Sequence, residues 1–120
     1  MHEEKSVDVA RSFLSDKELR DETRQSITDC IMATKMPVHP SNILEEIICD
    51  ADTYHVGTAE FFTLNKFVLD EMEARFGIKV IDRVSSSLQF LESHQFYTAY
   101  CQQKLQAGKE ENIRKLRSFL

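Results

Sequence analysis

Four carboxylates fall within eight residues near the middle of the chain, in the segment Glu45–Asp52. Carboxylates at this density can bind a divalent cation, pair with Lys or Arg, or face solvent. On a helix, Asp52 would lie at the edge of an apolar face, where a charge is costly unless it is paired, hydrogen-bonded or bound to a cation. Asp50 would point about 200° away from Asp52, at roughly 100° per residue. At most one of the two aspartates could therefore bind a metal in a single pocket.

The same segment has the pattern of an amphipathic helix. Its apolar residues recur at spacings of three and four: Ile43, Leu44, Ile47, Ile48 and Ala51. This spacing predicts a helix whose apolar side is buried. Ser41 or Asn42 would cap its start, and the two glutamates that follow suit a capping box. We expect the helix to end near Tyr54–Gly57, where Gly57 could adopt a left-handed C-cap.

The composition of the whole chain favours helices. Only three Gly and two Pro occur among 120 residues, which leaves little turn chemistry for a sandwich or barrel. No alternating run is long enough to suggest a strand. A chain of this length can bury one hydrophobic core. We therefore expect residues 1–120 to form a single all-α domain, a helical bundle of six to seven helices.

Apolar residues at helical spacing place these helices along the chain. The predicted helices span about residues 3–14, 16–34, 42–54, 58–76, 79–90 and 95–105, with a short last helix after residue 108. Asp16 is the expected N-cap of the second helix, and Thr58 is that of the fourth. Gly77 should end the fourth helix, and Gly108 should interrupt the chain before the last one.

Charge and cysteine usage exclude several classes of protein. The net charge of −5 argues against a general nucleic-acid binder, which would need a basic patch. No apolar run approaches the roughly 20 residues of a membrane span, and the first residues lack the apolar region of a signal peptide. Cys30, Cys49 and Cys101 are widely spaced and form no Cys-x-x-Cys motif, which is typical of reduced thiols. We therefore expect a cytoplasmic protein that binds neither membranes nor nucleic acid directly.

Five segments of the chain carry a recognisable pattern. They are His2-Glu3-Glu4-Lys5-Ser6, Ile31-Met32-Ala33-Thr34-Lys35-Met36-Pro37, residues 44–52 with Gly57 and Phe61 following, residues 90–97, and residues 108–113. Together they resemble the C-terminal half of HD-domain metal-dependent phosphohydrolases. The segments at 90–97 and 108–113 resemble the tail of one subgroup of that family.

The resemblance implies an all-helical fold around a divalent metal, either Mn, Ni, Mg or Fe. In an intact member the metal would activate water against a phosphoester of a small molecule or nucleotide. Asp52 matches a metal ligand of the family, and His2 matches a further histidine near the metal. Asp50 would orient the ligands. His55, three residues after Asp52, would share its helix face and could orient Asp52 or bind the metal, or else be a partly exposed imidazole paired with that carboxylate. Lys35 would neutralise a substrate phosphate, or else be a solvated lysine.

The chain departs from the family in one respect. An intact member also uses an early His and an adjacent His-Asp pair, and none of the four histidines here (His2, His39, His55 and His94) precedes an Asp. We therefore expect an N-terminally truncated HD domain that binds metal weakly, if at all, and is inactive or incomplete as a hydrolase. His39 should lie in a surface loop and His94 should be packed.

An alternative hypothesis comes from another class of function. The chain could be a non-catalytic helical interaction module in which the acidic helix pairs with a basic partner. Self-association is expected for a separate reason. If the helices missing from a truncated HD domain normally cover the apolar face of the central helix, their loss would leave a patch that monomers rarely tolerate. A symmetric dimer could bury it, so a homodimer is expected.

Overall fold

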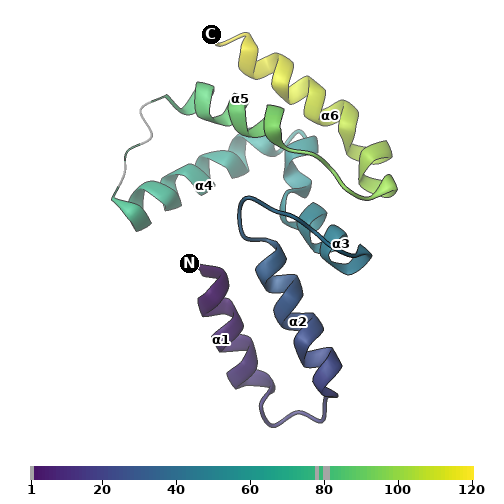
Figure 1. Ribbon diagram of the computed structural model, residues 1–120. Coiled ribbons are helices and arrows are strands. Elements are labelled where there is room, and N and C mark those ends of the chain that lie inside the picture. Colours follow the sequence, from purple (N-terminus) through teal and green to yellow (C-terminus); the bar gives the residue numbers. More distant parts are fainter. Residues whose placement is uncertain (1, 78, 80–81) are drawn as a thin grey trace. The chain divides into compact units, whose positions relative to one another are not determined.

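The computed structural model describes residues 2–77, 79 and 82–120 (Figure 1). These residues form helices and turns, and no strand occurs among them, which confirms the predicted all-α fold class. The helices are α1 (His2–Leu14), α2 (Asp21–Ala33), α3 (Ile43–Asp52), the 3₁₀ helix η1 (Tyr54–Gly57), α4 (Phe61–Phe76), α5 (Arg83–Ser93) and α6 (Ala99–Arg117). The chain divides into two compact units, Met1–Asp52 and Thr53–Leu120.

In the first unit, α1 packs against α2, and α2 packs against α3. The second helix begins at Asp21, so the predicted start at Asp16 is wrong. The guanidinium of Arg24 donates hydrogen bonds to the carbonyl oxygens of Leu14, at 2.7 Å, and Lys17, at 2.5 Å. Because the Arg24 side chain occupies these carbonyl oxygens, they do not accept the backbone hydrogen bonds of a helix. The residues that connect α1 and α2 therefore form a turn.

The start of α3 has the predicted capping box. The backbone N–H of Glu45 donates to Asn42 Oδ1 at 3.0 Å, and the Ser41 N–H donates to Glu45 Oε1 at 3.2 Å. The predicted C-terminus is wrong, because α3 ends at Asp52 and a separate 3₁₀ turn follows. Gly57 does not adopt the left-handed conformation. This position needs a residue without a side chain because η1 lies against α6. A Cβ atom on residue 57 would lie 2.5 Å from Leu105 Cβ.

The second unit contains the main hydrophobic core. Its fully buried members come from η1, α4, α5, α6 and the segment before α6: Val56, Phe61, Leu91, Phe96, Cys101, Leu105 and Leu116. Helix α6 runs unbroken through Gly108, so the predicted interruption at that residue is wrong. Gly108 lies against the backbone of Gly57, where a larger residue would collide. Both glycines therefore allow the backbones of η1 and α6 to come into contact where the two elements cross.

The remaining boundaries of the second unit follow its capping residues. Gly77 ends α4 with φ 67°, as predicted. Helix α4 itself begins at Phe61 and not at Thr58, because the Thr58 carbonyl first closes a turn onto the Phe61 N–H. Asp82 caps α5 by accepting from the Ser85 N–H at 3.0 Å, so the predicted start at residue 79 is early. Of that predicted segment, residues 80 and 81 lie outside the described residues.

Helix α6 also starts later than predicted. Thr98 Oγ1 accepts a hydrogen bond from the backbone N–H of Cys101 at 3.2 Å, which makes Thr98 the N-cap. The preceding residues from 94 to 97 belong to no helix and lead from α5 into α6. The predicted start at Gln95 is therefore wrong. Phe96 is buried, and its apolar side chain was counted as part of the helix although it belongs to the connection before it.

Candidate functional site

The apolar face of α3 is exposed, which contradicts its predicted burial. The exposed fractions are 59 % for Ile43, 54 % for Leu44 and 52 % for Ile47. Cys49, on the opposite face, is buried at 4 % exposure, and Asp50, beside the apolar arc, is buried at 2 %. The thiol of Cys49 donates to the carbonyl oxygen of Ala33 at 3.3 Å, which places this side of α3 against the end of α2. The orientation of the helix is therefore the reverse of that expected from its hydrophobicity.

The two aspartates of α3 also differ from expectation. Asp50 is buried and Asp52 is exposed, whereas the sequence placed Asp52 at the edge of a buried face. Burial raises the pKa of the Cys49 thiol, and the negative charges of Asp50 and Asp52 raise it further. Asp50 and Asp52 thus make the end of α3 acidic.

The predicted site residues His2, in α1, and Lys35, after α2, each lie beside a carboxylate of α1. The exposed imidazole of His2 has its Nε2 2.5 Å from Oε2 of the buried Glu3. The ammonium of Lys35 lies 2.5 Å from Glu4 Oε1. This hydrogen bond lowers the pKa of Glu4 to about 2 and raises that of Lys35. The charge of Lys35, proposed from the resemblance to bind a substrate phosphate, is thus engaged by a carboxylate of its own chain.

The other histidines lie in separate environments. His55 belongs to η1 and not to the helix of Asp52, so the predicted shared helix face does not exist. Its ring stacks on Phe61 with the centroids 6.1 Å apart. His94 is packed as predicted, with its ring 4.6 Å from that of Phe96 and its Nε2 2.8 Å from Thr53 Oγ1. His39 is exposed between helices, which confirms its predicted place in a surface loop.

The donor atoms do not fit a resident divalent ion in the part of the chain that the structure describes. A firmly held ion needs at least three converging protein donors. No group of three or more His, Cys, Asp or Glu side chains in the described residues is arranged to hold one. Asp52 and His2 thus belong to no such group among the residues that the structure describes.

Two buried residues of α6 were missed by the sequence analysis. Asn112 is buried and donates through Nδ2 to the carbonyl oxygens of Val56 and Thr58, at 2.9 Å each. Lys109 is also buried and donates to the carbonyl oxygen of His94, and its burial lowers its pKa. The signal was present, because Leu105, Lys109, Asn112 and Leu116 recur at helical spacing once Gly108 is accepted inside the helix.

None of the described helices is long and apolar enough to cross a membrane. The chain matches no protein-family model, no curated protein and no solved structure. The resemblance to HD-domain phosphohydrolases therefore stays a prediction that rests on the motifs alone.

Proposed function

We propose that this chain is a non-catalytic helical interaction module, and that α3 is the surface by which it binds a partner. The observation that carries the proposal is the exposure of Ile43, Leu44 and Ile47 in the first unit. With Ile48, these side chains cover an arc of about 140° at roughly 100° per residue. An apolar arc of this width is the size that one helix buries against another.

Charge identifies the kind of partner that suits α3. The helix contains four carboxylates and no basic residue. Asp52 follows Ile48 on one side of the apolar arc, and Glu46 lies on the other side at helical spacing. Asp50 is buried and takes no part in this edge. A second copy of α3 would place carboxylates against carboxylates, which is unfavourable. The partner that fits is an amphipathic helix with an apolar face and Lys or Arg along both edges.

A designed peptide tests this proposal directly. The probe is a fluorescent amphipathic helix with leucine on one face and lysine at the other positions, compared with the same peptide carrying glutamate for lysine. We expect the full chain to bind the lysine peptide and not the glutamate peptide, and added salt to weaken the binding because the flanking charges are exposed. The substitution Ile47→Lys should reduce affinity about tenfold or more, since it puts a charge in the centre of the apolar face.

The matched control is Val9→Lys, which changes an exposed apolar residue on α1 in the same way. It should leave peptide binding unchanged. Equal loss of binding in both variants would overturn the proposal, and so would equal binding of the two peptides. Thermal unfolding adds a second criterion. A large loss of stability in Ile47→Lys would show that the face belongs to a core and not to a binding surface.

The second candidate is the metal-dependent phosphohydrolase of the resemblance. The observation in its favour is that unit Met1–Asp52 buries two carboxylates, Glu3 and Asp50, and carboxylate oxygens are the donors that hard cations prefer. Titration calorimetry with Mn²⁺ on the chain and on Asp52→Ala separates the two functions. Binding that disappears in Asp52→Ala would favour the hydrolase.

A further inference from the structure

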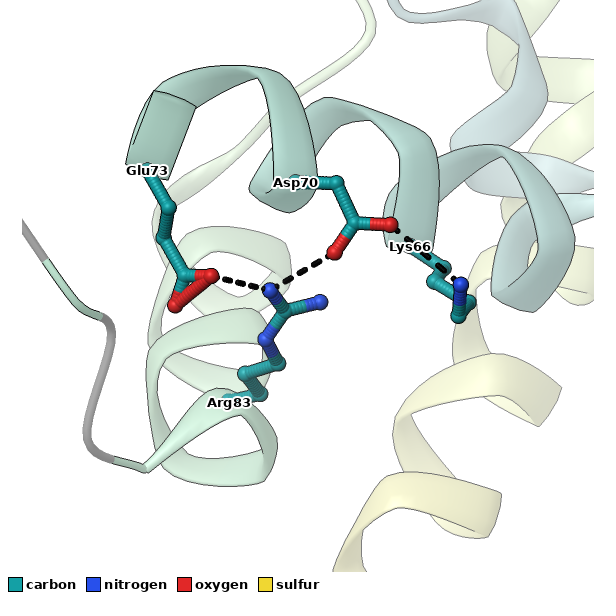
Figure 2. A network of polar contacts seen from close by, with 4 residues as sticks. All are labelled: Lys66, Asp70, Glu73 and Arg83. Atoms are coloured by element: carbon teal, nitrogen blue, oxygen red, sulfur yellow. Dashed lines mark hydrogen bonds and ion pairs between the residues drawn. The ribbon is translucent and has the colours of Figure 1, made fainter. Parts of the chain in front are cut away.

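Charged side chains link helix α4 to the start of α5 (Figure 2). Arg83, at the start of α5, lies 2.8 Å from Asp70 Oδ1 and 2.5 Å from Glu73 Oε2. Lys66 adds a further ion pair to Asp70 at 3.2 Å. One turn towards the start of α4, Asn65 donates to Ser87 Oγ of α5 at 2.8 Å. These contacts use the polar side of α4 and leave much of its apolar side uncovered.

The uncovered side forms a continuous strip along α4, which we call the α4 ridge. Its members repeat every four residues, with one neighbour beside them: Leu64, Val68, Met72, Phe76 and Phe67. Residues four apart lie above one another on one helix face. Phe67 is 61 % exposed and Val68 is 44 % exposed. At 1.5 Å per residue, the strip from the first member to the last is about 18 Å long.

We propose that the α4 ridge is a self-association surface that packs against the same ridge of a second copy of this chain. This proposal is independent of peptide binding by α3, since it concerns another helix in the other unit. The two faces differ in charge. Glu71 and Arg75 lie beside the α4 ridge and pair with each other at 3.6 Å, so this edge has no net charge.

The arrangement of these charges suits a copy of itself. When two helices pack antiparallel about a two-fold axis, the same edge of each helix meets its equivalent in the other copy. With Met72 near the axis, Val68 of one copy lies opposite Phe76 of the other. Arg75 of one copy then comes within a turn of Glu71 of the other, and opposite charges face each other across the interface. The equivalent pairing of α3 would bring together acidic residues only.

Sedimentation equilibrium on the full chain, from micromolar to near-millimolar concentration, tests the proposal. We expect a reversible monomer–dimer equilibrium. Val68→Lys and Met72→Lys should each raise the dissociation constant of the dimer about tenfold or more, because each buries a charge at its centre. Both positions are partly exposed in the single chain, so both variants should keep the circular dichroism and the unfolding temperature of the original.

Two controls locate the association on α4. Ile47→Lys removes the proposed peptide-binding face of α3 and should leave the dimer unchanged, and Val9→Lys should do the same. A monomer at every concentration would overturn the proposal. A dimer that survives both α4 substitutions, or one that is lost in Ile47→Lys, would overturn it as well. Monomers that bind lipid vesicles through Val68 and Met72 would overturn it in favour of a membrane surface.

Discussion

A Cβ atom on Gly108 would lie 2.0 Å from the carbonyl oxygen of Gly57, so α6 and η1 meet backbone to backbone. Glycine inside a helix costs about 1 kcal/mol relative to alanine. Helix α6 nevertheless continues through Gly108 because the crossing leaves no room for a side chain. The glycine that looked like a helix breaker in the sequence is thus the residue that lets the two elements come together.

The variant Gly108→Ala tests this contact, because two physical effects would change the free energy of unfolding in opposite directions. Helix propensity alone predicts a gain of about 1 kcal/mol. Overpacking against the Gly57 carbonyl predicts a loss of about 1–3 kcal/mol, and we expect this loss to dominate. The measurement is the free energy of unfolding in urea. Ala107→Gly, at an exposed neighbouring position, calibrates the propensity term. A more stable Gly108→Ala variant would show that the two backbones are not in contact.

Asn112→Asp should destabilise the second unit by about 1–3 kcal/mol at neutral pH, because a carboxylate would face two carbonyl oxygens that now receive hydrogen bonds. It should be worse than Asn112→Ala. The folded-state pKa of the new carboxyl would be raised, so stability is retained at low pH and lost as pH rises through that pKa. Urea unfolding at several pH values measures this. Gln103→Glu, an exposed amide-to-acid change on α6, should show no such dependence; a similar profile in both variants would refute the buried role of Asn112.

The Glu4–Lys35 pair predicts a local titration in the first unit. Glu4 has its pKa lowered from about 4.5 to about 2, chiefly by the hydrogen bond from Lys35. A carboxyl with a lowered folded-state pKa contributes stability above its unfolded pKa, and this contribution is lost as pH falls towards 2. Carbon-detected NMR of the Glu4 carboxyl should show the low pKa. Lys35→Met should return it towards 4.5, while Lys5→Met should not. An ordinary pKa in the original chain would mean that the pair does not form.

We expect little or no phosphohydrolase activity from this chain. Metal-assisted hydrolysis needs a bound ion with several protein donors and an open position for water, and the described residues gather no group of three donors. The assay is hydrolysis of a generic phosphoester with Mn²⁺ or Ni²⁺ supplied, for the chain and for Asp52→Ala. Metal-dependent turnover that disappears in Asp52→Ala would contradict the expectation, and His2 and His55 would then be the first residues to examine.

The sequence was sufficient for features that depend on local chemistry. The helical spacing of apolar residues, the Asn42 capping box and the left-handed Gly77 all follow from interactions within a few residues. Features that depend on contacts between residues far apart in the sequence could not be predicted from local patterns. Asp16 looked like an N-cap, but Arg24 satisfies the nearby carbonyls. Gly108 looked like a break until its contact with residue 57 was known.

The orientation of α3 shows the same limit for the candidate surface. Periodicity identified which residues share a face, and it identified them correctly. It could not tell which face is turned inward, because that depends on contacts such as the one between Cys49 and the Ala33 carbonyl. The assumption that the apolar side is buried holds for a helix that covers its own core. The proposed binding of a partner helix by α3 would account for an apolar side that remains exposed.

The crossing of η1 and α6 also has a consequence for how this chain can change over evolutionary time. Helix α6 holds the backbone on both sides of Gly57 through Asn112, and it contacts Gly57 itself through Gly108. Gly57 and the two α6 residues Gly108 and Asn112 lie far apart in the sequence but depend on one another in the structure. We expect related chains to keep all three residues or to replace them together, because any one replacement alone would have to pass through a less stable protein.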